Sequence, residues 1–298
     1  MPTARTWTQT LFSDPPQPES TMSPRPLLPA ATCLLVTACA GAGPSGPPAL
    51  AYGVPDPTEV TYVQGDTTLV EISLMGQTME LSQEGVADYA VTFGPSADVV
   101  SVRMTVTALS ATINQPMGAP LRLDEDDVTG ELAFSMDRRG QVTISALPQV
   151  ADAASQMVSG LALAHTFFPG LPGAAPAVGG SWVDTVSYEG AEGPGMSSEQ
   201  TILEYTVVGD SLLDGRTLLN ITFLGTTERT TDLEVGGMAV NQSSTLDVEG
   251  HVLWDRQAGL MYESVRTATG TGTVRVPISP APLPIELSMR RHTRLKGM

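Results

Sequence analysis

Apolar and polar residues alternate with a period of two along most of the chain after Thr58. In residues 101–109, one face carries the apolar side chains of Val102, Met104, Val106 and Ala108. Such alternation is typical of a β-strand with one buried face. Comparable runs recur at 67–74, 88–93, 131–136, 141–146, 182–188, 201–208, 217–224, 243–248, 260–265 and 271–276. Gly-, Asp- and Pro-containing turns separate them, which predicts a mainly β fold with an antiparallel curved sheet or unclosed barrel.

One interval, residues 148–168, follows a helical period instead. Its apolar stripe consists of Val150, Ala154, Met157, Leu161, Ala164 and Phe168. Pro148 suits a first helical turn, and Pro169 with Gly170 suits the end of a helix. We therefore expect one central amphipathic helix over 148–168, which buries this stripe against the sheet.

The segments on the two sides of this interval resemble each other. Residues 130–140 and 250–259 each contain an apolar run with an aromatic residue, an Asp-Arg pair and a glycine, which is typical of a hairpin. This similarity predicts two related halves, about 58–147 and 180–276, within one β domain over 58–298. Chance similarity between hairpins is the alternative.

The residues before Thr58 have a different composition. Residues 1–21 are polar and contain several prolines, which predicts a disordered or non-native extension. From Met22, a basic residue, a short apolar stretch and small residues follow in the order of a secretory signal peptide, over 22–38. The Gly/Pro-rich residues 39–57 are predicted to form a tether. Whether translation starts at Met1 or Met22 stays open.

The end of this signal, Leu35-Val36-Thr37-Ala38-Cys39, resembles the lipobox of bacterial lipoproteins. The resemblance implies cleavage before Cys39 and acylation of that residue, with palmitate among the chains, and several acyl chains anchor a protein stably. Ala40 stands where an Asp would imply retention in the inner membrane, so the resemblance implies the periplasmic face of the outer membrane of a Gram-negative bacterium. An ordinary signal peptide is the alternative, and the membrane and leaflet stay open.

A tethered antiparallel β domain with a helix also resembles the LolA-like lipoprotein-carrier superfamily, from about Thr58 to the end. The resemblance implies a curved, unclosed sheet around an apolar cavity and an apolar or lipid ligand. Candidates for lining such a cavity are Trp182, Trp254, Met157 and Leu161. Aromatic residues in strands are more often core residues, which is the alternative for the two tryptophans.

Composition excludes several classes of protein. The 298 residues carry 32 acidic and 15 basic side chains, for a net charge of -17, and Lys296 is the only lysine. A nucleic-acid surface needs clustered basic residues, so we expect no nucleic-acid partner. Two cysteines cannot form a disulfide framework. The chain also contains no run of about 20 apolar residues, so the sequence predicts no transmembrane helix.

The basic residues concentrate at the end of the chain, at Arg290, Arg291, Arg294 and Lys296. They follow an alternating apolar pattern, which predicts a last strand. One interpretation is a patch for anionic lipid; the other is a strand whose basic side chains pair with the acidic body.

No motif for catalysis is recognisable. His165, His251 and His292 are scattered, and the chain has no nucleophile elbow, phosphate loop or zinc-protease motif. The acidic run 124–127 lacks the ligand spacing of a calcium loop. We therefore expect no catalytic residue, no metal and no cofactor.

These patterns together predict a membrane-anchored lipoprotein of the cell envelope that acts as a non-catalytic binding module for an apolar or lipid ligand. The alternative is a structural or protein-interaction lipoprotein of the outer membrane, with an unidentified envelope partner, and an enzyme is a third option. The ligand, the partner and the oligomeric state stay open.

Overall fold

The computed structural model describes residues 50–74, 76–96, 98–116, 118–151, 154–155, 158–192, 195–235, 238–277 and 279–297. All of them belong to one of the two compact units of the chain, Gly46–Met298. The predicted extension, the signal peptide with Cys39 and the cavity candidate Met157 lie outside the described residues.

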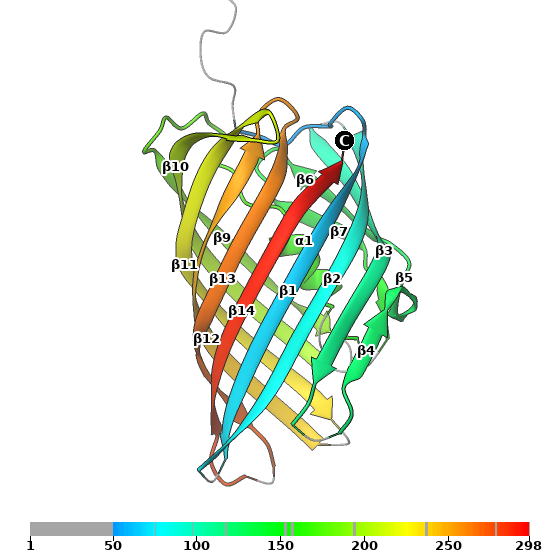
Figure 1. The fold of residues 1–298 in the computed structure, drawn as a ribbon, viewed down its shortest axis with the longest axis vertical. Helices are drawn as coiled ribbons and strands as arrows, with labels where there is room; N and C mark the ends of the chain where they lie inside the picture. The colour runs from blue at the N-terminus through cyan, green and yellow to red at the C-terminus, as the bar shows by residue number, and fades with distance from the viewer. Residues whose placement is uncertain are drawn as a thin grey trace, which may run out of the picture. The chain divides into compact units, whose positions relative to one another are not determined.

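A single antiparallel sheet dominates this unit (Figure 1). Eleven of its twelve strands follow the order β7-β6-β3-β2-β1-β14-β13-β12-β11-β10-β9, and β4 pairs with β3. The strands are β1 (Glu59–Leu74), β2 (Gln77–Ser96), β3 (Val99–Asn114), β4 (Leu121–Asp124), β6 (Leu132–Asp137), β7 (Val142–Ala146), β9 (Ser181–Glu192), β10 (Gly195–Leu213), β11 (Arg216–Val235), β12 (Met238–Asp255), β13 (Leu260–Arg275) and β14 (Leu283–Gly297). The predicted mainly β, antiparallel and unclosed sheet is confirmed.

Each half of the chain contributes one meander to this sheet, β1-β2-β3-β6-β7 and β9-β10-β11-β12-β13. The last strand, β14, lies between β13 and β1, so the two ends of the described chain are neighbours. The hairpins expected around Gly140 and Gly259 are present, and both glycines have a positive φ, of 92° and 66°. Glycine adopts this conformation without a steric penalty.

The sheet curls, and glycines and β-bulges allow the curvature. A Cβ at Gly225 of β11 would collide with the carbonyl oxygen of Ile202 on β10. A Cβ at Gly250 of β12 would collide with the carbonyl oxygen of Val265 on β13. The register also shifts by a bulge within β2–β3 and within β12–β13. Bulges and close approaches at glycine are the usual means by which strands bend sharply.

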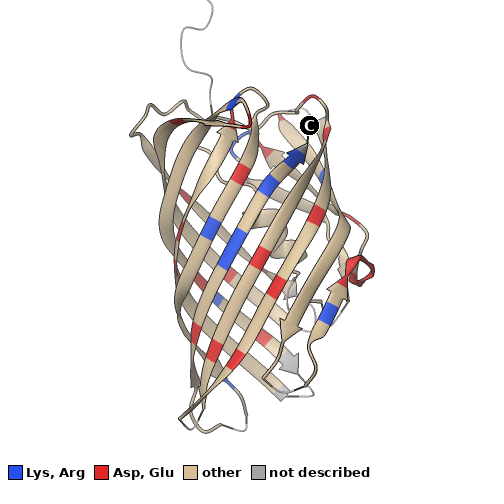
Figure 2. Cartoon of the chain, viewed as in Figure 1, with Lys and Arg blue, Asp and Glu red and all other residues tan. Residues whose placement is uncertain are grey.

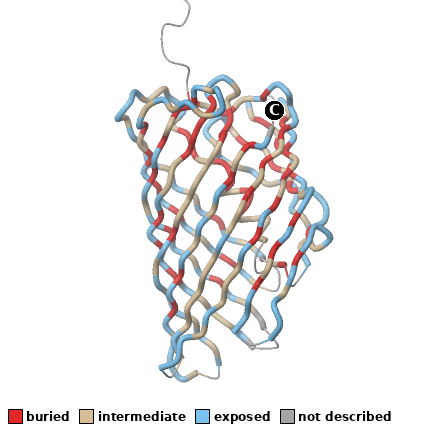
Figure 3. The backbone as a smooth tube through the Cα atoms, in the orientation of Figure 1, coloured by how far each residue is buried: buried red, intermediate tan, exposed pale blue. Residues whose placement is uncertain are grey.

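The concave face is the face that packs on the core, and Figure 3 shows how buried and less buried positions alternate along the strands. Its centre is aromatic. Phe168 contacts Tyr52, Tyr62 and Phe93 edge-on, with ring centroids 5.7, 6.1 and 6.0 Å away. Edge-to-face packing of buried rings is favourable beyond the burial of area alone, so this cluster is the main packing centre of the unit.

The helix, α1 (Gly160–Thr166), is shorter than the predicted interval 148–168. Ser159 caps its start, because the Ser159 hydroxyl accepts the N–H of Ala162 at 2.9 Å. Earlier in the interval, β8 (Gln149–Val150) pairs with β5 (Val128–Thr129). Backbone groups that pair between strands cannot also form a helix, so tertiary pairing shortens the helix that the apolar period predicts.

α1 and the residues after it lie between the two edges of the sheet, against β9, β6 and β7. The indole Nε1 of Trp182 on β9 donates to the carbonyl oxygen of Gly170 at 3.0 Å. On the other side, the N–H of Leu171 donates to the carbonyl oxygen of Arg139, in the turn between β6 and β7, at 2.7 Å. Residues 160–171 therefore join the two edges that the strands leave unpaired.

The described part of the predicted tether, residues 50–57, packs on the unit. Leu50 and Tyr52 are buried, and the Tyr52 hydroxyl donates to the carbonyl oxygen of Pro169 at 2.7 Å. The Tyr52 N–H also donates to the carbonyl oxygen of Arg138 at 3.0 Å. These two large apolar side chains stand out in a Gly/Pro-rich stretch, and their burial explains why the ordered unit begins before Thr58.

Candidate functional site

A layer of polar side chains crosses the concave face halfway along the strands. Arg291 on β14 lies opposite Asp66 on β1 in the register, and its Nε donates to Asp66 Oδ1 at 2.6 Å. Gln64 Nε2 donates to the other carboxylate oxygen of Asp66 at 2.6 Å, and Gln64 Oε1 accepts from the hydroxyl of Thr293 at 3.2 Å. Each member of this chain of contacts therefore positions the next.

The layer continues on β13, where Arg266 lies directly opposite Arg291. Arg266 Nη2 donates to Thr227 Oγ1 at 3.0 Å, and the Thr227 and Thr201 hydroxyls are 2.8 Å apart. Thr201 in turn donates to Glu199 Oε1 at 3.2 Å. We call this set the polar layer: Gln64, Asp66, Glu199, Thr201, Thr227, Arg266, Arg291 and Thr293.

The two arginines differ in their electrostatic surroundings. Burial lowers the pKa of Arg266, and the negative charge of Glu199 opposes this effect only in part. Burial also acts to lower the pKa of Arg291, but the ion pair with Asp66 outweighs it and raises that pKa. Among the described residues, no acidic group forms an ion pair with Arg266. The guanidinium of Arg266 is therefore the less compensated charge of the pair.

The polar layer is not tightly packed on all sides. The side chains of Asp66 and Arg291 are 29% and 33% exposed, and Arg266 is also partly exposed. Space of at least the size of a water molecule therefore remains beside these side chains on the concave face.

A small cavity of about 30 Å³ lies between the end of α1 and strands β9, β10 and β13. Arg266, Asp184 and His165 contribute its ionisable side chains. Burial raises the pKa of Asp184, although its carboxylate accepts the N–H groups of Thr185 and Gly170. Burial lowers the pKa of His165, whose ring stacks on Tyr188 at 5.3 Å. A space of this size with polar walls suits one water molecule or one small polar group.

On the other side of the polar layer, toward the β1–β2 hairpin, the concave face becomes apolar. Strands β1, β12 and β14 contribute the members of this apolar strip: Val70, Ile72, Leu246, Val248, Leu287 and Met289. Val70, Ile72 and Met289 are only partly buried. Partly exposed apolar side chains that converge on one concave surface are typical of a binding surface for an apolar molecule.

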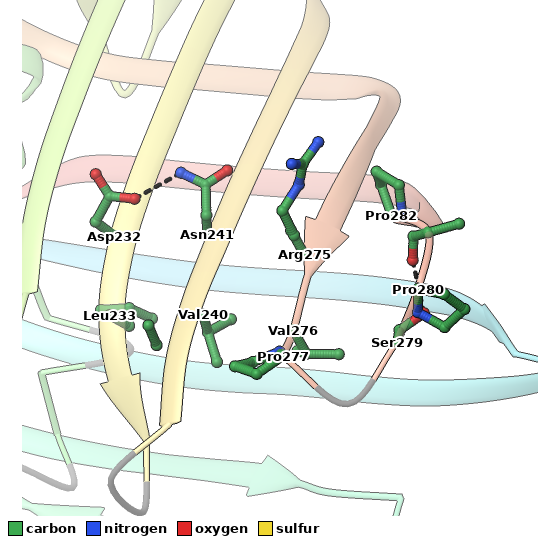
Figure 4. Close-up of a pocket in the computed structure, with 12 residues that line it drawn as sticks. Asp232, Leu233, Val240, Asn241, Arg275, Val276, Pro277, Ser279, Pro280 and Pro282 are labelled. Atoms are coloured by element: carbon green, nitrogen blue, oxygen red, sulfur yellow. Dashed lines mark hydrogen bonds between the residues drawn. The ribbon is translucent and has the colours of Figure 1, made fainter.

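A larger groove of about 470 Å³ lies at the ends of β11, β12 and β13, beside residues 276–277 and 279–282 (Figure 4). Its walls are mostly apolar and include Leu233, Val240, Val276, Pro277, Pro280, Ala281 and Pro282. The polar groups are Arg275, Ser279 and the pair Asp232–Asn241, in which the amide of Asn241 donates to the carboxylate. The groove is a second apolar surface, at the strand ends.

The structure places the described cavity candidates in the packed part of the unit. Trp254 is buried against Tyr52, with ring centroids 4.9 Å apart. Trp182 stacks on Tyr205 at 5.2 Å, and Leu161 lies over Gly190 of β9. None of Trp182, Trp254 and Leu161 lines the cavity or the groove described above.

Acidic residues of other strands and of one turn lie near the basic residues of the last strand (Figure 2). Besides the pair with Asp66, Arg294 pairs with Asp214, and Lys296 Nζ lies 2.8 Å from Asp88 Oδ2. These contacts agree with the interpretation of a strand that pairs with the acidic body. Within the described residues, Arg290 is the member of this run that forms no ion pair.

Two of the three histidines meet on the convex face. His251 Nε2 and His292 Nε2 lie 3.7 and 3.5 Å from the carboxylate of Glu263, which also lies 3.7 Å from Arg294 Nε. Sequence reasoning missed this cluster because β13 brings the two histidines together from separate strands. Among the described residues, no three His, Cys, Asp or Glu side chains are arranged to hold a metal ion.

Sequence reasoning also missed the polar layer. The available signal was the period of two along each strand. It places Arg266 on the same face as Ala268 and Gly270, and Arg291 on the same face as Leu287 and Met289. This period alone places each arginine on the same face as small or apolar residues. It does not bring residues of β1, β10, β11 and β13 together, which the strand order does.

No protein-family model matches this sequence, and no curated protein matches it. Solved structures similar to the chain include OccK5 (OpdH) of Pseudomonas aeruginosa, with 7% identity over 82% of this chain and 100% of that chain and a TM-score of 0.28. The outer membrane protein OmpT of Vibrio cholerae has 8% identity, coverages of 79% and 99% and a TM-score of 0.17. Pseudomonas aeruginosa OccK2 (OpdF), in complex with glucuronate, has 7% identity, coverages of 81% and 99% and a TM-score of 0.19. The resemblance is distant, so function is argued from the residues of this chain alone. No helix within the described ranges is long and apolar enough to cross a membrane.

Proposed function

We propose that this chain is a lipid-anchored protein of the cell envelope whose curved sheet binds an apolar or amphiphilic small molecule on its concave face, without catalysis. The observation that carries the proposal is the apolar strip, where Val70, Ile72 and Met289 stay partly exposed on a concave surface. Covering these side chains with an apolar ligand is favourable by about 25 cal/mol for each Å² of apolar surface removed from water.

The anchor in this proposal is Cys39, and the location is the periplasmic face of the outer membrane. The anchor follows from the lipobox resemblance of residues 35–39, and the location follows from Ala40 at the next position. The Gly/Pro-rich residues that follow Cys39 would separate the ordered unit from the membrane surface.

Binding of an uncharged apolar fluorophore to the full chain, with Cys39 replaced by Ala to avoid the acyl chains, tests the proposal. We expect saturable fluorescence enhancement. Ile72→Gln, within the apolar strip, should weaken the affinity about tenfold, because an amide would have to be desolvated. The matched control is Ser73→Gln, on the next residue and the opposite face, which should bind like the parent. Absence of saturable binding, or equal effects of the two substitutions, would contradict the proposal.

A protein-interaction role is the second candidate, and the convex face near β9 favours it. The convex side chains Val183 and Leu224 are 63% and 64% exposed. Exposed apolar side chains that lie close together on a surface are typical of a site that another protein contacts. A photo-crosslinker at Val183 should then capture one envelope protein reproducibly, whereas a crosslinker at the exposed Thr269 of β13 should not.

A further inference from the structure

We propose that Arg266 binds the anionic head group of an amphiphile whose apolar tail lies along the apolar strip. The ligand class is a long-chain molecule with one carboxylate or phosphate group at its end. This inference rests on the proposed function and specifies the ligand of the same concave surface.

Arg266 has hydrogen-bonding capacity that the protein leaves unused. A guanidinium carries five N–H donors, and Arg266 donates to the Thr227 hydroxyl. Within the described part of the chain, Arg266 forms no ion pair. The negative charge of Glu199 acts on it, but the Glu199 carboxylate accepts its side-chain hydrogen bond from the hydroxyl of Thr201. A partly exposed guanidinium with free donors can bind an anion through two of them side by side.

The neighbouring arginine shows why the head group would bind at Arg266. Arg291 lies opposite Arg266 in the register and already pairs with Asp66 at 2.6 Å. Asp184 faces the same small cavity as Arg266, but it accepts the N–H groups of Thr185 and Gly170. One guanidinium of the layer is therefore available to an incoming anion, which fits a head group with a single charge.

The space around Arg266 suits a small head group. Arg266 lines the cavity of about 30 Å³ together with the Thr201 and Tyr205 side chains. Such a cavity accommodates a group of about the size of a water molecule, so a carboxylate oxygen can replace water there without a large rearrangement.

The tail has a matching surface. From Asp66 to Ile72, β1 extends by six residues, which at about 3.3 Å per residue corresponds to about 20 Å. On β1 the apolar strip begins at Val70, after the polar Thr68. On β14 and β12 it begins at Met289 and Val248, in the row next to the polar layer. A charged head at the polar layer and a long alkyl tail toward the β1–β2 hairpin would therefore each meet groups of their own polarity.

Three fluorescent probes with the same alkyl chain test the inference: a carboxylate, a monoalkyl phosphate and an uncharged alcohol. We expect the parent chain, with Cys39 replaced by Ala, to prefer an anionic probe over the alcohol by about tenfold or more. Arg266→Met should bind the alcohol as the parent does and lose this preference. Arg290→Met, on the neighbouring strand and the convex face, is the matched control and should keep it. The carboxylate and phosphate arms show which head group is preferred.

The outcomes separate this inference from the proposed function. Equal affinity of the parent for all three probes, or an unchanged preference in Arg266→Met, would overturn the inference while the apolar binding surface stands. Absence of binding by every probe would instead contradict the proposed function. Circular dichroism and thermal melting report whether Arg266→Met is folded, and Arg266→Gln, which keeps hydrogen-bonding groups but no charge, provides a second neutral variant with the same expected loss.

Discussion

Arg291 on the last strand donates to Asp66 on the first strand at 2.6 Å, and this ion pair joins residues 225 positions apart on the concave face. It lies where β14 inserts between β1 and β13, the contact that connects the two meanders. The pair therefore contributes both to the seam between the two halves and to the polar layer of the candidate site.

Removing the acid of this pair should destabilise the protein. In Asp66→Asn, Arg291 would keep its charge on the concave face without its ionic partner. We expect the free energy of unfolding to fall by about 1–2 kcal/mol, a value reduced because both side chains are about one-third exposed. Urea denaturation followed by circular dichroism measures the change.

The matched control is Asp88→Asn, which removes the partner of Lys296 on the convex face. The Lys296 side chain is 59% exposed, so this pair should contribute less than about 1 kcal/mol. A larger loss in Asp88→Asn than in Asp66→Asn would contradict the assignment of the concave pair as the stronger one.

Gly225 should not tolerate a side chain. Its added Cβ would collide with the carbonyl oxygen of Ile202, so Gly225→Ala must shift one of two paired strands. We expect a loss of about 1–3 kcal/mol in the free energy of unfolding. Gly65→Ala is the control, because its nearest contact would be the carbonyl oxygen of Gly85 at 4.0 Å. That variant should be neutral or up to about 1 kcal/mol more stable, since alanine restricts the unfolded chain. Equal effects of both substitutions would show that the curvature does not depend on Gly225.

His165 should make the stability depend on pH. Burial lowers its pKa below 6.5, so the folded protein binds the proton less readily than the unfolded chain does. The contribution of His165 to the free energy of unfolding is therefore complete above pH 6.5, and it is lost as the pH falls from there through the lowered pKa. We expect the parent to lose more stability than His165→Gln between about pH 7.5 and about pH 5. Thermal melts measure this difference, and an NMR titration of the imidazole protons measures the pKa directly. A His165 pKa above 6.5 would refute the expected direction.

Cys39 should be the acylated residue. In a Gram-negative host supplied with labelled palmitate, the parent should incorporate label, and Cys39→Ser should incorporate none and leave the membrane fraction. Cys33→Ser is the matched control, because Cys33 lies inside the apolar stretch that the signal would discard. Label in Cys39→Ser, or loss of label in Cys33→Ser, would contradict the lipobox assignment.

The sequence alone predicts the strands well because their signal is local. Alternation at residues 101–109, the Asp-Arg turns with Gly140 and Gly259, and the apolar stripe that contains Leu161 and Ala164 each lie within a few neighbouring residues. Burial of one strand face and the conformation of a tight turn each select residues within a short segment. The local sequence pattern is therefore enough to predict both. The start of the helix depends on a long-range contact as well, because β5 pairs with residues 149–150 inside the predicted interval.

The polar layer could not be predicted in this way. The period of two places Arg266 and Arg291 on the same strand faces as small or apolar residues. It cannot specify that β14 lies between β13 and β1, or that α1 spans the gap between β7 and β9. Those arrangements depend on the total burial and hydrogen bonding of all strands at once. The sequence by itself therefore determined which segments are strands and which of their faces are apolar. Only the tertiary structure decided which charges meet: Arg291 pairs with Asp66 across the seam, whereas Arg266 forms no ion pair among the described residues.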